Sequence, residues 1–469
     1  MLVYFSAENF RSIKDKVSLD LKTAPRLRRM PHHAVTPTKD KSLKVLRSAL
    51  IYGANASGKS NIIKAISYSK NIITRSFTPS KKLATDPFLL CDEPKKDSSF
   101  YFEFVSNGKL YGYGIRLNSQ RIEHEYLYIY ISNEDEICML DREYDKDKNE
   151  YNIKSEIFEY EDDEEYKEKI KELSSLIKYT PETKTFLSEV KDKKLYSKSK
   201  LGKIASPFGV ACAFFYQQLL IIFPNTVYLG LASDLDNGND RDSSYIDHLA
   251  KFDTGVHKIV SEKVSLDIFD DEVISEIKER LISEPAFISH IYNGQEYRFQ
   301  LENNGELVAS KIRSLHKLQS GKEVSFSIDN ESDGTKRLLD LLPALSGNDP
   351  DEGSYTYIID EFERSLHPNL SKHFLKTFLE CVGGHPQDQL IVTTHESSLL
   401  DSSLLRRDEI WFAQKERDSS TSLYSLNDYS PRFDKELRKA YLDGIFGAVP
   451  IIMNSFAKDK KNKECIDKE

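Results

Sequence analysis

Paired cysteines are missing from this sequence. The five cysteines lie far apart, in odd number and without any CxxC spacing: Cys91, Cys138, Cys212, Cys381 and Cys465. This pattern excludes the common zinc ligand sets and offers no disulfide framework. We therefore expect buried or free thiols in a reducing compartment.

The sequence also lacks a long hydrophobic run and a secretory leader. The longest apolar segment, GVACAFFYQQLLIIF, is interrupted by Gln217 and Gln218 and is too short to span a bilayer. The first residues, MLVYFSAENFRS, show no basic region followed by an apolar core and a small-residue cleavage site. We expect a cytoplasmic protein that makes no use of a membrane.

An excess of positive charge is missing as well. The formal net charge is -9, which argues against a uniformly basic DNA-coating protein. Hydrophobic residues make up 39% and charged residues 30%, the balance of a soluble globular chain. A chain of 469 residues is too long for one small core, so we expect two or three lobes.

The segment VLRSALIYGANASGKSNIIKAISYS contains the pattern GxxxxGKS between an apolar β-rich run and a helix-favouring run. A phosphate-binding P-loop needs this context, because backbone N–H groups and the helix N-terminus surround the phosphate oxygens of ATP. Lys59 would reach the β- and γ-phosphates, and the Ser60 hydroxyl would complete the shell of a Mg²⁺ ion. A chance match is the alternative, and the flanking pattern disfavours it. The candidate nucleotide ligands are Gly53, Ala54, Asn55, Ala56, Ser57, Gly58, Lys59, Ser60 and Asn61.

Two carboxylates follow the apolar run YTYII, and a histidine follows the later run LIVTT. In a P-loop sheet, an acidic residue at the C-terminal end of a strand lies beside the nucleotide. Asp360 is placed to hold Mg²⁺ through water, and Glu361 to polarise the attacking water. His395 can hydrogen-bond the γ-phosphate or that water. The alternatives are carboxylates that only cap a loop and a histidine with a structural role.

The stretch ESDGTKRLLD, residues 331–340, passes from polar residues into a leucine-bearing helix. As an ordinary helix start it would use Ser332 or Asp333 as the N-cap. In the chain, however, GANASGKS, ESDGT, YTYIIDEFE, RSLHPNL and VTTH follow the order of Walker A, signature, Walker B, D-loop and H-loop in ABC-type ATPases. ESDGT resembles a divergent signature of that family. The resemblance implies that Ser332, Asp333, Gly334 and Thr335 close over the γ-phosphate held by a second copy of the chain.

Two further groups of motifs narrow this resemblance. FSAENFRSIKDKVSLDL resembles the opening strand and NFRS turn of SMC, RecF and OLD-like ATPases, which makes Arg11 a candidate nucleotide contact. Asn55 is similar to the GxNGSGKS loop of that branch, in which Ala56 here replaces a glycine. ESDGTKRLLDLLPAL, IIDEFERSLHPNL, TTHESSLLD, LRRDEIWFAQK, LYSLNDY and YLDGIFGAVP resemble phage-defence ATPases of the RloA and AbiL type, related to the PARIS ATPase.

The resemblance implies an α/β fold, a P-loop ABC-type head with a mixed sheet that is split by a large, mainly helical insertion. It also implies a head-to-head dimer or higher homo-oligomer that controls a separately encoded effector, such as a Toprim-like or RloB-like nuclease. It covers both ends of the chain and is weak from Ile131 to Gly294. Residues 76–104 depart from the family because they contain no glutamine for a Q-loop, and DPFLL, Asp86 to Leu90, is the segment at the corresponding place.

We predict three parts of the chain. Residues 1–130 form the N-terminal lobe of the head, 131–294 the insertion, a lever or partner platform, and 295–469 the C-terminal lobe. Within the insertion, YEDDEEYKEKIKELSSLIK predicts a solvated helix with Glu-to-Lys pairs, and SPFGVACAFFYQQLLIIFPN a buried or interfacial helix. FISHIYNGQEYRFQLENNGELVASKI predicts two hairpin turns in strands that complete the antiparallel sheet of the head.

Positive charge gathers near the N-terminus. From Arg11 to Arg47 there are eleven Lys or Arg residues against three acidic ones, Asp15, Asp20 and Asp40. This excess could meet DNA phosphates or an acidic phage protein as a trigger, or it could be a solvated surface. No aromatic interleaving or base-reading motif decides between these interpretations.

Taken together, the patterns favour an ATP-binding and ATP-hydrolysing switch in a prokaryotic anti-phage system. The alternative is a DNA-repair ATPase of the RecF or SMC kind. A nuclease of the OLD kind is disfavoured, because fewer than about eighty residues follow His395, too few for a Toprim domain by ordinary domain sizes.

Overall fold

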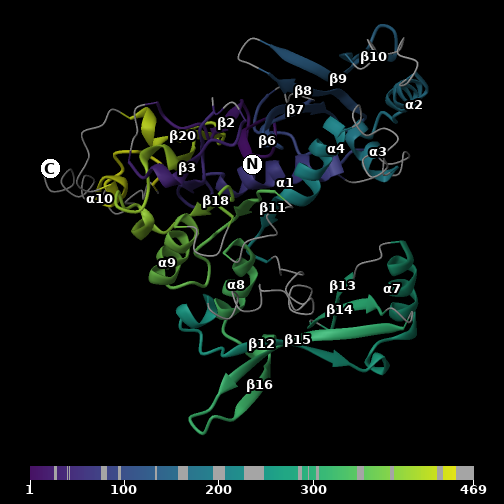
Figure 1. The fold of residues 1–469 in the computed structure, drawn as a ribbon. Helices are drawn as coiled ribbons and strands as arrows, with labels where there is room; N and C mark the ends of the chain where they lie inside the picture. Colours follow the sequence, from purple (N-terminus) through teal and green to yellow (C-terminus); the bar gives the residue numbers. More distant parts are fainter. Residues whose placement is uncertain are drawn as a thin grey trace, which may run out of the picture.

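The structure is a computed structural model of the chain. It describes every residue except 26–28, 40, 42, 75–81, 93–96, 132–134, 157–166, 194–205, 226–247, 284–287, 294, 303–305, 346–352, 381–384, 430–436 and 450–469. The described residues form three large sheets and one two-stranded sheet. Two of the large sheets build a head, and the third belongs to a lobe that joins the head at helix α8 (Asp333–Leu341) (Figure 1).

A seven-stranded sheet forms one layer of the head. Its order is β10-β9-β8-β7-β6-β1-β2, and every neighbouring pair is antiparallel. Buried and partly exposed residues alternate along β6 and β8, which is the pattern of a sheet with one face against a core. The strands are β1 (Leu2–Glu8), β2 (Val17–Asp20), β6 (Ser98–Ser106), β7 (Lys109–Leu117), β8 (Ile122–Tyr130), β9 (Glu136–Asp145) and β10 (Glu150–Lys154).

A six-stranded sheet forms the second layer, in the order β11-β17-β18-β5-β19-β20. The strands from β11 to β19 run parallel, and β20 is antiparallel at the edge, so the predicted mixed sheet is confirmed. Its central strands are buried at every position, as a sheet covered on both faces requires. The strands are β5 (Ser48–Tyr52), β11 (Leu219–Ile222), β17 (Thr356–Ile359), β18 (Gln389–Thr394), β19 (Ile410–Lys415) and β20 (Thr421–Ser425).

Two hydrophobic cores cover the two faces of this second sheet. Ala49 and Ile51 of β5 point into the core shared with the seven-stranded sheet and helix α1 (Lys59–Thr74). Leu50 and Tyr52 point to the opposite side, where α8, α9 (Pro368–Leu379) and α10 (Leu437–Leu442) pack. The period of two along β5 therefore sends successive side chains into different cores.

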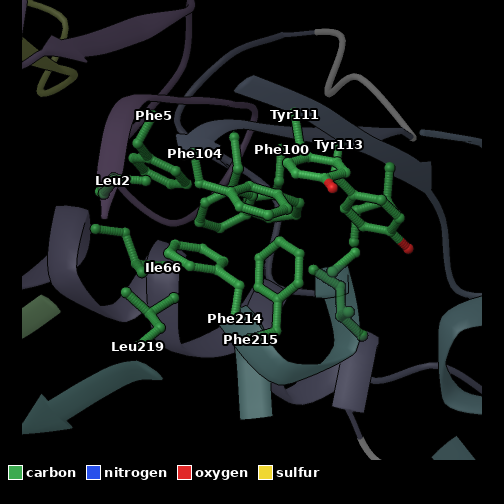
Figure 2. Packing of buried hydrophobic residues seen from close by; sticks show 14 of the residues in the cluster. Leu2, Phe5, Ile66, Phe100, Phe104, Tyr111, Tyr113, Phe214, Phe215 and Leu219 are labelled. Atoms are coloured by element: carbon green, nitrogen blue, oxygen red, sulfur yellow. The ribbon is translucent and has the colours of Figure 1, made fainter. Parts of the chain in front are cut away.

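Aromatic rings fill the core between the two sheets (Figure 2). Phe104 of β6 stacks on Phe214 with ring centroids 4.1 Å apart. Phe215 meets Phe102 edge to face at 5.0 Å. Because Phe214 and Phe215 follow α4 (Ser206–Ala213) and lead into β11, this packing fixes the segment SPFGVACAFFYQQLLII in the head. The predicted buried helix is confirmed in α4, and the same segment continues into a strand of the second sheet.

The third sheet forms a separate lobe. Its order is β12-β15-β14-β13, with β16 paired to β15, and α7 (Asp271–Ser283) packs on it through Phe269, Ile277 and Phe299. Its two predicted hairpins are confirmed as β13–β14 and β14–β15. These strands do not complete the sheet of the head as predicted, because β15 pairs with β12 and β16 instead. The strands are β12 (Lys258–Val264), β13 (Ile288–Tyr292), β14 (Gln295–Leu301), β15 (Leu307–Lys317) and β16 (Glu323–Ser327).

The described part of residues 131–294 contains helices and strands. The helices are α2 (Lys167–Lys178), α3 (Phe186–Asp192), α4 and α7. Strands β9 and β10 extend the seven-stranded sheet, and β11 joins the six-stranded one. Residues 131–294 therefore contribute to the head as well as to the lobe. Of the predicted solvated helix, α2 covers 167–178, while residues 160–166 lie outside the described residues.

The remaining described elements are short. Strands β3 (Ala34–Val35) and β4 (Val45–Leu46) pair with each other. Single helical turns are η1 (Pro31–His33), η3 (Phe214–Gln218), η4 (Leu266–Ile268), η5 (Ile328–Asn330), η6 (Leu342–Ala344), η8 (Ser397–Leu399), η9 (Arg407–Glu409) and η10 (Leu426–Asp428). No helix among the described residues is both long enough and apolar enough to cross a membrane.

Candidate functional site

Three neighbouring strands end at the same edge of the six-stranded sheet. β17, β18 and β5 are adjacent and parallel, so their C-terminal ends lie side by side. Asp360 follows β17, His395 follows β18, and Gly53 follows β5. This edge therefore gathers three motifs, of which the first and the last are 342 residues apart in the chain, as the sequence predicted.

The loop from Gly53 to Gly58 lies against the β19–β20 hairpin. A Cβ added at Gly53 would come 2.4 Å from the carbonyl oxygen of Ala413, and one at Gly58 would come 1.9 Å from Oγ1 of Thr421. Gly58 also has φ +100°. Only glycine fits both requirements at this position. Ala56 adopts φ 61°, the left-handed region, where the related loop has a glycine.

Lys59 folds back over this loop. Its Nζ donates to the carbonyl oxygens of Gly53 at 2.7 Å and Ala54 at 2.9 Å, and it lies 3.3 Å from Nδ1 of His395. The side chain is buried, and burial lowers the pKa of Lys59 to about 8, opposed most by the carboxylate of Glu363. A buried ammonium bonded only to neutral groups is available to a phosphate that enters the loop.

Ser60 and Asp360 face each other across the strand ends. The Ser60 hydroxyl donates to Oδ1 of Asp360 at 3.1 Å, and the hydroxyl of Thr393 donates to the same oxygen at 2.6 Å. Asp360 is buried. Two converging oxygens of this kind fit Mg²⁺, which binds oxygen ligands and usually keeps several waters besides one or two protein ligands and the substrate phosphates.

Glu361 is held at an unusual backbone angle. Its φ is 49°, its N–H donates to Oγ1 of Thr393 at 2.9 Å, and its carbonyl oxygen accepts from the N–H of Arg364 at 3.0 Å. A non-glycine residue in the left-handed region costs free energy, and such angles persist where the surrounding structure enforces them. The half-buried carboxylate of Glu361 raises the pKa of both Lys59 and His395 through its charge, so it lies near these two groups.

His395 closes the group on the side of β18. Partial desolvation and then the charge of Lys59 lower the pKa of the imidazole, so the neutral form prevails near pH 7. Its main-chain N–H donates to Oε1 of Glu363. A neutral imidazole can accept from Lys59 or donate to a phosphate or water oxygen, depending on its tautomer.

The predicted signature residues begin α8. Ser332 is the N-cap, and its Oγ accepts from the N–H of Thr335 at 3.1 Å. Ser332 and Asp333 are exposed, whereas Thr335 is buried. A Cβ at Gly334 would lie 2.9 Å from the carbonyl oxygen of Ser365, so the signature turn packs on the turn that follows Walker B. The structure thus leaves the two residues at the tip open to solvent.

Arg11 is linked to the phosphate loop through the residue that follows it in the chain. Its Nε pairs with Oδ2 of Asp86 at 2.7 Å, and its N–H donates to the carbonyl of the same residue. The next residue, Ser12, accepts from Nδ2 of Asn61 at 2.7 Å. The DPFLL segment is therefore joined to the phosphate loop through Arg11, Ser12 and Asn61.

Several residues of this group were missed in the sequence. Thr393 lies in VTTH and Ser12 in NFRS, but within these motifs only His395 and Arg11 were predicted as site residues. Thr421 lies in no motif. Its hydroxyl donates to the carbonyl oxygen of Ser57 at 3.1 Å because β19 places β20 close to the phosphate loop that follows β5. Glu363 carried a usable signal, since it is the third carboxylate in DEFE, two residues after Glu361.

The chain matches one family model over residues 48–401, and the description of that family is "AAA domain, putative AbiEii toxin, Type IV TA system". The match covers both the phosphate loop and His395. A comparison with curated proteins found no match.

Two similar solved structures are SMC heads. One is an SMC head bound to the C-terminal winged-helix domain of ScpA, with 12% identity, a TM-score of 0.36, and coverage of 90% of this chain and 97% of that one. The other is the SMC head domain from Thermotoga maritima, with 14% identity, a TM-score of 0.36, and coverage of 90% and 98%. Likeness at these scores is too low to assign a function.

Proposed function

The chain belongs to the AAA-domain family that it matches over residues 48–401, and from this premise we propose that it is an ATP-hydrolysing switch. The single observation that carries the proposal is the gathering of Lys59, Ser60, Asp360, Glu361 and His395 at one sheet edge. These residue types supply a cation for phosphate, oxygen ligands for Mg²⁺ and groups for orienting water.

Different residues of the chain are proposed to bind phosphate, bind the metal ion and orient water. Lys59 leaves the carbonyls of its loop and meets the β- and γ-phosphates, while the loop N–H groups surround them. Ser60 and Asp360 would hold Mg²⁺, which would supply positive charge that offsets the negative phosphates. Glu361 orients the attacking water, and His395 hydrogen-bonds that water or the γ-phosphate.

A second copy of the chain completes the site in this proposal. Ser332 and Asp333 stand exposed at the N-terminus of α8, with the serine hydroxyl and the first N–H groups of the helix near the tip. Such a helix start favours a negatively charged group, and the γ-phosphate in a partner copy's loop is the group proposed here. ATP would then clamp two heads together, and hydrolysis would reopen them.

The biological role proposed is that of the ATPase component of a prokaryotic anti-phage system. The motifs that resemble RloA and AbiL ATPases, together with the family description that names an AbiEii toxin and a Type IV TA system, support this role. We propose that the clamped dimer or higher oligomer controls a separately encoded nuclease. DNA or a phage protein is the proposed trigger class, and Lys and Arg residues between 11 and 47 are the first surface to test.

Three variants test the switch. Lys59→Ala should abolish ATP binding measured by calorimetry, because the buried cation is lost, and wild-type affinity in this variant would refute the nucleotide site. Glu361→Gln should bind ATP with Mg²⁺, fail to hydrolyse it, and elute as a larger species than the ATP-free protein. Ser332→Arg in the Glu361→Gln background should restore the smaller species while ATP binding to the single head persists. Equal elution of all these proteins with and without ATP would refute the clamp.

A further inference from the structure

Glu363 joins two turns that come from different strands. It lies two residues beyond Glu361, in the turn between β17 and α9, and its Oε1 accepts the main-chain N–H of His395 after β18. Its own carbonyl accepts from the N–H of Leu366 at 2.9 Å, which fixes the turn locally. The hydrogen bond therefore sets the distance between the turn that carries Glu361 and the turn that carries His395.

The second oxygen of Glu363 is enclosed. Oε2 is removed from solvent and has no hydrogen-bond partner among the described residues, and the same is true of the Tyr52 hydroxyl at the end of β5. The carboxylate acts electrostatically on Tyr52, on Lys59 and on His395, so its charge lies among all three. A buried carboxylate oxygen without a partner carries a free-energy cost, and such costs are retained mainly at functional sites.

The neighbours of Glu363 define what this charge can do. Lys59 is buried and is bonded to two carbonyl oxygens and to an imidazole, none of which carries a negative charge at neutral pH. Among the nearby carboxylates, that of Glu363 acts on Lys59 more strongly than those of Asp360 and Glu361. The charge of Glu363 thus makes the largest single contribution among these carboxylates to stabilising the buried ammonium before a phosphate arrives.

We propose that Glu363 is a positioning residue of the nucleotide site, whose hydrogen bond from the His395 N–H fixes the turn that carries His395 relative to the turn that carries Glu361. This inference rests on the proposed ATP hydrolysis. Glu363 transfers no proton and binds no metal ion in this role. It acts through His395, so its loss misplaces an imidazole that remains chemically intact.

The consequence is a separation of binding from turnover. The phosphate loop and Lys59 remain without Glu363, and removal of one negative charge does not oppose the binding of a polyanion. His395, however, would no longer be held at its working distance from Glu361. A misplacement of about 1 Å in such a group can cost about 100-fold in rate.

The experiment measures ATP affinity and single-turnover hydrolysis in purified full-length variants. Glu363→Ala should lower kcat about 10- to 100-fold while the Kd for ATP stays within about threefold. The kcat of Glu363→Gln should lie between that of Glu363→Ala and that of the wild type, because the amide keeps an acceptor for the His395 N–H but loses the charge. Glu380→Ala, a carboxylate exposed at the end of α9, is the matched control and should leave both quantities unchanged.

A double-mutant cycle separates positioning from general stabilisation. Because Glu363 acts through His395, the double variant Glu363→Ala, His395→Ala should turn over no more slowly than His395→Ala within about twofold. A merely structural role would instead lower the melting temperature and multiply the two kinetic losses. Unchanged kcat in Glu363→Ala, or multiplying losses in the cycle, overturns this inference while the ATPase proposal stands. Absence of hydrolysis by the wild type overturns both.

Discussion

The guanidinium of Arg337 donates from Nη2 to the main-chain carbonyl oxygen of Asp360 at 3.1 Å. The same nitrogen lies 3.3 Å from the carbonyl oxygen of Glu361, and Nη1 reaches the carbonyl of Phe223 at the same distance. Arg337 belongs to α8, the helix that begins with the exposed Ser332. The helix that presents the signature residues is therefore bonded to the turn after β17, which carries the proposed metal ligand Asp360 and the proposed catalytic residue Glu361.

Replacement of Arg337 should weaken both the fold and the site. Arg337→Met leaves up to three enclosed carbonyl oxygens without their donor, and burial makes such losses costly, so we expect the free energy of unfolding to fall by about 3 kcal/mol. The strained turn at Glu361 would also lose a support, and ATP hydrolysis should fall in the fraction that remains folded. Urea unfolding with a single-turnover ATPase assay measures both effects. Lys336→Met, one residue earlier and partly exposed, is the control and should change neither quantity appreciably.

The sequence predicted the parts of the site that local motifs define. Strand, loop and helix around Lys59 can be read from residues 45–69, because glycines, a lysine and a serine at fixed spacing have one common structural meaning. The same holds for Asp360 and His395, each placed at the end of a continuous apolar run. The parallel order of the strands then brings these ends together without further information.

Contacts between distant segments could not be predicted from one sequence. Thr421 packs against Gly58 only because β20 is the edge strand of the sheet, and an isolated threonine between polar residues carries no signal. The sequence predicts the two hairpins of the lobe because their strands are close in the chain. It does not predict that they form a sheet apart from the head, because the pairing of β15 with β12 joins residues about fifty positions apart. Local turn chemistry fixes a hairpin, and the choice of its outer neighbour depends on tertiary packing.

Ala56 offers a test of loop strain. Its φ of 61° costs an alanine roughly 1 kcal/mol relative to a residue without a Cβ. Ala56→Gly should therefore raise the free energy of unfolding by up to about 1 kcal/mol and preserve ATP binding. Ala54→Gly, at a neighbouring position without positive φ, should lower it by about 0.5 kcal/mol, because glycine adds freedom to the unfolded chain. Denaturant unfolding compares the two, and equal losses in both variants would show that the loop relieves the strain elsewhere.

Lys70 of α1 gives a pH-dependent prediction. Its ammonium donates to the carbonyl of Leu219 at 2.6 Å, and burial lowers its pKa from 10.5 to about 8. Because the folded pKa lies below the unfolded one, the charged lysine destabilises the fold below pH 8, and the penalty disappears as pH rises above 10.5. Lys70→Met loses one hydrogen bond but removes this penalty, so we expect a gain of about 1–2 kcal/mol at pH 7.

The difference between Lys70→Met and the wild type is the quantity to follow. It should shrink between pH 8 and pH 10.5, where the folded protein has lost the Lys70 proton and the unfolded chain still holds it. Lys64→Met on the same helix controls for the general effect of a methionine. A stability difference that stays constant over this pH range would contradict the assigned burial of Lys70.

The last prediction concerns the connection between the lobe and the exposed tip of α8. Glu331, the residue before Ser332, accepts from the Ser314 hydroxyl and lies 2.7 Å from Nε2 of His316, both on β15. On the other side of this connection, Leu339 and Leu342 pack with Ile259 of the lobe, while Leu338 and Leu341 pack in the head. A movement of the lobe would therefore be transmitted through these contacts to the signature turn.

Glu331→Ala should break the polar part of this path while the apolar part keeps the lobe attached. Hydrogen bonds to a charged, mostly buried carboxylate contribute about 1.5–3 kcal/mol, so we expect about 2 kcal/mol lower stability. In the Glu361→Gln background, the ATP-dependent increase in size should require a higher protein concentration, because the tip that contacts the partner copy is held less firmly. Glu323→Ala on the neighbouring strand, where the side chain is half exposed, is the control. Sedimentation at several protein concentrations measures the dimer affinity. If Glu331→Ala lowers stability but leaves the dimer affinity unchanged, Glu331 contributes to folding and not to the dimer contact.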